Sequence, residues 1–138
     1  METVRATSVD ELVGLLRDSW NRHDMATYVA LFGPDAVYVN AIGTVWRGHE
    51  EIERGHQRLH GTVFRESKIT KMTHRETAVA AGVAVCVCDW EMVGAKPPEG
   101  WRMPDPRRGI MTLVLVWGEN GWQIAAGQNT EKLALQVS

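Results

Sequence analysis

Two histidines four residues apart, His56 and His60, are the side chains of this 138-residue chain best suited to chemistry. On a helix, residues i and i+4 lie on one face, so the two rings would lie close together. An imidazole changes protonation state near neutral pH, which suits proton transfer inside a cavity. The alternative is a histidine that fills core space and makes one hydrogen bond, and the sequence leaves both interpretations open.

Paired helical histidines can also hold a metal, as they do in zinc enzymes. Glu53 is the nearest candidate for a further ligand, and His49 is expected to be solvated near the start of the helix. Because no third ligand is evident, we predict neither a metal site nor a cofactor. The sequence has no glycine-rich phosphate loop, nucleophile elbow or dinucleotide-binding fingerprint.

Four further polar side chains are candidates for orienting a ligand. Tyr38 and Asn40 alternate onto the same face of a predicted strand. Gln128 shares the face of Ile124, which should point inward, whereas Asn129 falls on the opposite face unless a bulge intervenes. The alternative for Tyr38 and Asn40 is an exposed strand face, and the alternative for Gln128 is a hydrogen bond to the N-terminal helix.

Aromatic residues supply the rest of the predicted pocket. The chain has six tryptophans, and most of them should be buried. We predict that Trp46, Trp90 and Trp101 contact a ligand, with Trp101 packing over the pocket mouth or a dimer seam. The arginines near Trp101 are expected to be solvated, with binding of an acidic group as the alternative; they are Arg102, Arg107 and Arg108.

Helices and short strands make up the first half of the predicted structure. Ser8 to Glu11 forms a capping box that starts a helix, and Asp24 caps a second, shorter one. A strand follows at residues 36–42, then a short strand through Trp46 and a third helix from residue 48 to a C-terminal cap at Gly61.

The second half is predicted to be rich in strands, with a proline-containing loop. The predicted elements are a strand within residues 64–73, a turn at 75–77, strands at 78–92, 109–117 and 122–129, a loop at 94–107 and a hairpin turn at 119–121. Helices followed by an antiparallel sheet indicate the α+β class. We predict one domain over residues 1–138, a cone-shaped antiparallel sheet curved around the N-terminal helices.

Composition narrows the classes of partner. A formal net charge of −2 gives no drive towards nucleic acid or anionic membranes, and no apolar run reaches the roughly 20 residues of a membrane span. Cys86 and Cys88 lie too close together for an ordinary disulfide, which favours a cytoplasmic location. The last strands are apolar on both faces, which predicts a homodimer through the outer face of the sheet.

Residues spread over nearly the whole chain resemble the nuclear-transport-factor-2-like superfamily, in its SnoaL-like branch, and most of all the SgcJ/EcaC group. The matching residues are Trp20, His23-Asp24, Leu31-Phe32, residues 35–40, Gly43, residues 46–48, Ile52, residues 121–124 and residues 128–130. The resemblance implies a cone-shaped α+β fold that is usually dimeric. Members include ketosteroid isomerases, polyketide cyclases, dehydratases and binding domains without activity.

The resemblance also implies a role in natural-product pathways, including those of enediyne antibiotics. It places Asn40 where ketosteroid isomerases have a basic aspartate, and an amide cannot accept that proton. We therefore expect a cavity that binds a hydrophobic polycyclic or polyketide-like ligand. The alternatives are a cofactor-independent cyclase, isomerase or dehydratase that uses His56 or His60, and a protein scaffold with a vestigial cavity.

Overall fold

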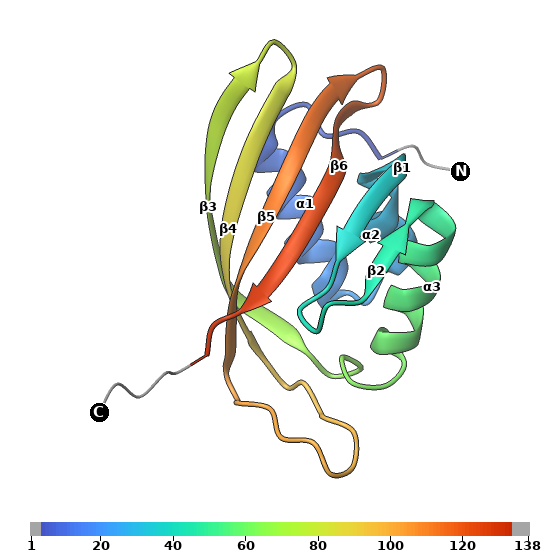
Figure 1. Ribbon diagram of the computed structural model, residues 1–138, viewed down its shortest axis with the longest axis vertical. Helices are drawn as coiled ribbons and strands as arrows, with labels where there is room; N and C mark the ends of the chain where they lie inside the picture. The colour runs from blue at the N-terminus through green and yellow to red at the C-terminus, as the bar shows by residue number, and fades with distance from the viewer. Residues whose placement is uncertain (1–3, 134–138) are drawn as a thin grey trace.

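The computed structural model describes residues 4–133 and contains three helices and a six-stranded sheet. The elements follow the order α1 (Val9–Asn21), α2 (Met25–Ala30), β1 (Phe32–Val39), β2 (Val45–Arg47), α3 (Gly48–His60), β3 (Lys68–Ala80), β4 (Val83–Val93), β5 (Arg107–Gly118) and β6 (Gly121–Glu131). The strand order across the sheet is β2-β1-β6-β5-β4-β3 (Figure 1). The α+β class is confirmed.

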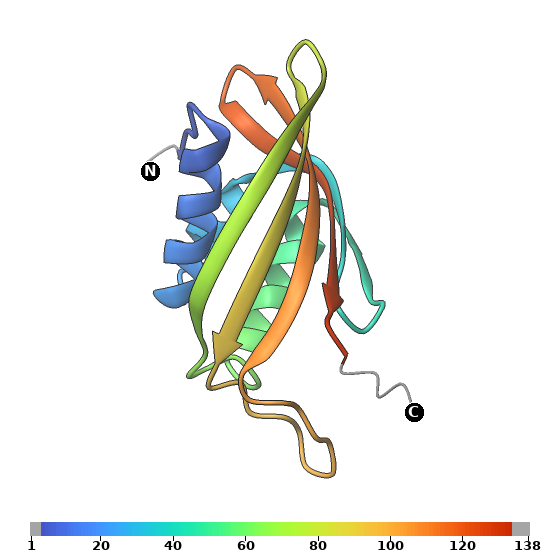
Figure 2. The same cartoon turned by 90° about the vertical axis from the view of Figure 1, so that its left-hand side faces the viewer.

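The sheet curves, and the helices pack on its concave side. Figure 2 shows α1 and α3 on one side of the long strands, with the loop between β4 and β5 extending beyond the end of the sheet. This layering places a continuous buried cluster between helices and sheet, with Leu12, Ile52 and Leu113 fully buried in it. No helix within residues 4–133 is long and apolar enough to span a membrane.

Both predicted helix caps are confirmed. Ser8 Oγ accepts a hydrogen bond from the backbone N–H of Glu11 at 3.0 Å, and the Glu11 carboxylate accepts from the Thr7 hydroxyl. Asp24 accepts from the N–H of Thr27 at 3.1 Å, which begins α2. These caps satisfy backbone donors that the first helical turn leaves without partners.

The sheet is antiparallel in every pairing except one. β1 runs parallel to β6, with Tyr38 opposite Gly127, and its register shifts between Phe32 and Val37. β1 therefore begins earlier than predicted and includes Pro34 and Asp35, because the register shift accommodates the proline within an extended strand. The short return strand β2 is antiparallel to β1, with Tyr38 opposite Trp46.

The predicted turn at residues 75–77 is wrong. These three residues lie inside β3, and the turn comes at Ala81-Gly82, where Gly82 has a φ of +70°. β3 is the outer strand of the sheet, so its polar side chains remain exposed to solvent. Polarity at an exposed edge strand therefore resembles a turn in sequence.

Candidate functional site

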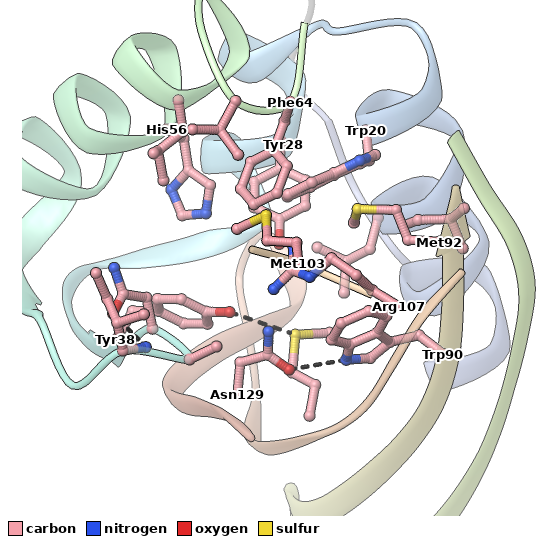
Figure 3. Close-up of a pocket in the computed structure, with 18 of the residues that line it drawn as sticks. Trp20, Tyr28, Tyr38, His56, Phe64, Trp90, Met92, Met103, Arg107 and Asn129 are labelled. Carbon is pink, nitrogen blue, oxygen red and sulfur yellow. Dashed lines mark hydrogen bonds between the residues drawn. The ribbon is translucent and has the colours of Figure 1, made fainter. Parts of the chain in front are cut away.

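A cavity of about 250 Å³ lies between the helices and the concave face of the sheet. Its lining is dominated by aromatic and aliphatic side chains from both layers (Figure 3). The tryptophan, tyrosine and phenylalanine residues that line it are Trp20, Tyr28, Tyr38, Trp46, Phe64, Trp90 and Trp101. A concave, mostly apolar space with a few polar groups is the usual form of a small-molecule site.

His56 faces this cavity from α3. Its side chain is 3% exposed, and its Nδ1 lies 2.8 Å from the Ile52 carbonyl oxygen of the same helix. A carbonyl only accepts hydrogen bonds, so Nδ1 carries the proton and Nε2 of the neutral ring carries a lone pair. Burial lowers the pKa of His56 to about 4, although the hydrogen bond to Ile52 partly opposes this shift. At neutral pH His56 is therefore a hydrogen-bond acceptor.

His60, the second candidate for chemistry in the cavity, is buried but is not among the residues that line it. Its Nδ1 lies 2.9 Å from Nδ1 of His23, and its ring packs edge-on against Trp20 at a centroid distance of 4.3 Å. Burial lowers the pKa of His60 to about 3, with further contributions from His23 and His56. His23 in the α1–α2 connection thus contacts one side of the ring, and Nε2 of His60 is buried without a hydrogen-bond partner in the described residues.

Tyr38 lines the cavity and is 4% exposed. Its hydroxyl donates to the sulfur of Met111 at 3.8 Å, which is a weak acceptor that a ligand oxygen could replace. Burial raises the pKa of Tyr38, so the hydroxyl keeps its proton at neutral pH. Tyr38 also stacks on Trp46, with ring planes 15° apart.

Asn40 lies at the edge of the cavity, where its side-chain oxygen shapes the β1–β2 turn. That oxygen accepts hydrogen bonds from the backbone N–H groups of Ile42 and Thr44, at 3.2 and 2.9 Å. Asn40 lines the cavity, but its side-chain carbonyl group already accepts the two hydrogen bonds of the turn. Only its amide nitrogen is left to contact a ligand.

Asn129 lines the cavity, whereas Gln128 is exposed and does not. Leu115 of β5 pairs with Ile124 and Val114 pairs with Ala126, so Ala125 is an extra residue in β6. This bulge reverses the inward and outward alternation that follows it. The prediction for Gln128 is therefore wrong, and the bulge on which the Asn129 prediction depended is present. The Asn129 side-chain oxygen accepts from the indole Nε1–H of Trp90 at 2.8 Å.

Two of the predicted tryptophans pack directly over glycines. A Cβ atom on Gly55 would lie 2.4 Å from the ring of Trp46, and one on Gly109 would lie 2.1 Å from the ring of Trp90. The glycines therefore let the indoles lie flat against α3 and β5. Trp101 is 66% exposed and reaches the cavity from the loop between β4 and β5.

Arg107 is another residue whose position differs from the sequence expectation of a solvated charge. The side chain of Arg107 lines the cavity, and only 4% of the residue is exposed to solvent. The guanidinium carbon lies 5.3 Å from the ring centre of Phe64 and 5.6 Å from that of Trp90, within the range of cation–π attraction. Nε donates to the Glu131 carboxylate at 2.7 Å, while Nη1 is buried without a partner in the described chain.

His49 is partly buried, and its ring Nε2 lies 2.5 Å from the Phe32 carbonyl oxygen, so it is not a solvated residue. This contact joins the start of α3 to β1. Within residues 4–133 no group of three or more histidine, cysteine, aspartate or glutamate side chains is placed to hold a metal ion.

Solved structures similar to this chain share its fold. An uncharacterized protein with a cystatin-like fold from Caulobacter vibrioides is 26% identical, with a TM-score of 0.80 over 91% of this chain and 88% of that one. A putative scytalone dehydratase from Novosphingobium aromaticivorans is 13% identical, with a TM-score of 0.76 over 94% and 87%. A ketosteroid isomerase-like protein from Erwinia carotovora atroseptica is 14% identical, with a TM-score of 0.69 over 91% and 94%.

No curated protein matches this chain. Residues 13–119 match the SnoaL-like domain, a span that includes most of α1, all of α2 and α3, and the strands from β1 to β5. The narrower grouping with SgcJ and EcaC stays a prediction. The match covers most of the chain and agrees with the fold, so the chain belongs to the SnoaL-like domain family.

Proposed function

We propose that this protein binds a planar, largely apolar small molecule in the cavity between α3 and the sheet. The observation that carries the proposal is the aromatic wall around a space of about 250 Å³. Such a volume is at the small end of ligand pockets and suits two or three fused rings. The family resemblance supports a polycyclic or polyketide-like compound from natural-product metabolism as the ligand.

Burial of apolar surface alone would give weak binding. A two-ring ligand that buries about 250 Å² gains roughly 6 kcal/mol at about 25 cal/mol per Å², and association costs at least about 4 kcal/mol. Tight binding therefore needs polar contacts. The lone pair on His56 Nε2 suits a ligand hydroxyl, because the ring is neutral and Nδ1 is already bonded to Ile52.

Acid/base catalysis by His56 is the second candidate function. The lone pair that faces the cavity favours it, since a neutral imidazole can accept a proton. Two observations make catalysis the weaker candidate: a pKa of about 4 describes a weak base, and none of the described residues that line the cavity is a carboxylate. Orientation of the imidazole by a carboxylate, as in hydrolase triads, thus has no counterpart in the described wall.

A cavity-filling substitution tests the binding proposal. Met72 lines the cavity from β3, so Met72→Trp should fill the space and reduce the affinity for 2-ethylnaphthalene at least tenfold in calorimetric titrations. Val79→Trp is the matched control on the same strand, because Val79 is exposed outside the cavity. Equal affinity in the wild type and Met72→Trp would place the binding elsewhere and contradict the proposal.

We also propose that the protein is a homodimer through the outer face of the sheet. Val87 and Val116 are each 40% exposed on this face, where Val85 pairs with Val114. A second copy would remove these side chains from water over an interface of roughly 1,200–2,000 Å². Val87→Lys should shift the mass measured by light scattering from dimer to monomer, and a wild-type monomer at tens of micromolar would contradict the proposal. A cytoplasmic location stays a prediction.

A further inference from the structure

Arg107 places a buried cation with an unused donor in the cavity wall. Phe64 and Trp90 pack against the guanidinium group, and Glu131 accepts from Nε. Nη1 is buried and has no hydrogen-bond partner in the described residues. Figure 3 shows the guanidinium group directed into the cavity, between His56 and Asn129. A buried donor without a partner is costly, so a ligand that supplies an acceptor there gains binding free energy.

The Glu131 carboxylate determines which kind of acceptor suits this position. It lies 2.7 Å from Nε and already compensates the positive charge of Arg107. A second carboxylate at Nη1 would leave the group with a net negative charge in an apolar environment, where an uncompensated charge is unfavourable. A neutral carbonyl oxygen satisfies the same N–H without adding charge.

Asn129 provides a second donor next to Arg107. Its side-chain oxygen is occupied by the indole N–H of Trp90, so its amide nitrogen is the group left for a ligand. In Figure 3 this amide lies beside Trp90 and below the guanidinium group of Arg107. Two donors therefore lie on the sheet side of the cavity, while the acceptor nitrogen of His56 lies on the helix side.

We propose that the ligand is an aromatic ketone or quinone whose carbonyl oxygen binds between Arg107 Nη1 and the Asn129 amide. This inference rests on the proposed function, because it assigns the chemistry of a ligand in the same cavity. It defines an orientation: the carbonyl faces β5 and β6, and the remaining ring surface lies among the aromatic side chains. It also predicts discrimination against isosteric hydrocarbons and against carboxylates.

Three naphthalenes that differ in one substituent test this inference by calorimetry. Wild-type protein should bind 2-acetylnaphthalene at least tenfold more tightly than 2-ethylnaphthalene, and no less tightly than 2-naphthoate. Arg107→Met should remove the preference for the acetyl compound over the ethyl compound. A loss of about 10- to 100-fold for the acetyl compound is expected for a hydrogen bond to a charged donor.

The neighbouring arginine provides the matched control. Arg108 is exposed and pairs with Glu91, so Arg108→Met should keep the preference for the acetyl compound. Glu131→Gln should shift the preference towards 2-naphthoate, because the charge of Arg107 would then lack compensation. If Arg107→Met does not fold, Asn129→Asp replaces it: the aspartate keeps an acceptor for Trp90 and removes the amide donor, and the preference should again be lost.

The outcomes separate this inference from the proposed function. Equal binding of the acetyl and ethyl compounds to the wild type would overturn the carbonyl assignment and leave an apolar binding cavity. Tighter binding of 2-naphthoate to the wild type would overturn it in favour of an acidic ligand. Absence of binding for all three compounds would contradict the proposed function itself.

Discussion

His56 and His60 lie one turn apart on α3 and differ in the direction of the ring nitrogen that is left without a protein partner. Both are buried, and burial lowers the pKa of each. His56 donates from Nδ1 to its own helix and leaves Nε2 for the cavity, whereas His60 pairs with His23 behind Trp20. Burial and pKa therefore do not separate a ligand-binding histidine from a structural one. The direction of the free nitrogen does.

The largest expected effect comes from removing the structural member of the pair. His60→Ala should lower the free energy of unfolding by about 3 kcal/mol, because it leaves a cavity beside Trp20 and an unpaired His23. Urea denaturation measures the loss. His49→Ala on the same helix should cost about 1 kcal/mol, since one partly buried hydrogen bond is lost. If His60→Ala also lost ligand affinity, the assignment of His60 as a structural residue and of His56 as the ligand-binding residue would be contradicted.

Acidification should destabilise the protein through both histidines. Each folded-state pKa lies below the ordinary value of 6.5, so the unfolded chain binds more protons between about pH 6.5 and 4. Stability is complete above pH 6.5 and is lost as the pH falls towards the folded-state values. The two histidines together should reduce the free energy of unfolding by about 2 kcal/mol between pH 6 and 5. In the double variant His56→Phe/His60→Phe, the free energy of unfolding should no longer fall in this way between pH 6 and 5. An unchanged pH dependence would show that these two histidines do not cause it.

A smaller effect is expected from His56 on ligand selection. Wild-type protein should bind 2-naphthol about tenfold more tightly than naphthalene, because the hydroxyl donates to Nε2. His56→Phe keeps a ring of similar shape and should abolish that preference in calorimetric titrations. His60→Phe is the matched variant and should retain it. Loss of the preference in both variants would show that the effect is transmitted through packing of α3.

Trp101 should have the smallest effect, because most of its surface is exposed. Trp101→Ala should weaken the binding of 2-ethylnaphthalene by a few-fold, in line with a loss of less than about 1 kcal/mol of apolar contact at the mouth. Fluorescence titration can measure this change. Arg102→Ala on the same exposed loop is the control and should have no effect. Unchanged affinity in Trp101→Ala would make the loop a simple connection.

The sequence was sufficient for those features that depend on local chemistry. The caps at Ser8 and Asp24 follow from short-range hydrogen bonding, and the inward direction of His56 follows from its four-residue spacing to Ile52. The sheet side of the cavity, which faces His56, could not be predicted in the same way. The bulge at Ala125, which turns Asn129 inward, is a property of strand pairing and leaves no strong sequence signal.

Burial of Arg107 depends on residues that are distant along the chain. Phe64 follows α3, Trp90 lies on β4 and Glu131 ends β6, and only the folded sheet brings all three to one guanidinium group. An arginine next to a proline-containing loop resembles a solvated charge when it is considered alone. Gly109 could have been a signal, because a strand glycine often marks the close approach of another group, here the ring of Trp90.

The width of the cavity depends on Gly55 and Gly109, which lie beneath Trp46 and Trp90 but do not line the cavity themselves. The three atoms nearest to a methyl group on Gly55 all belong to the Trp46 side chain, so the indole could swing inward and narrow the space. A methyl group on Gly109 would also lie 2.7 Å from the Thr130 carbonyl oxygen, and backbone cannot move aside so easily. A substitution at Gly55 on α3 can therefore change the size of ligand that fits without replacing any residue that touches the ligand. The position of Trp90 over β5 is instead fixed by the sheet.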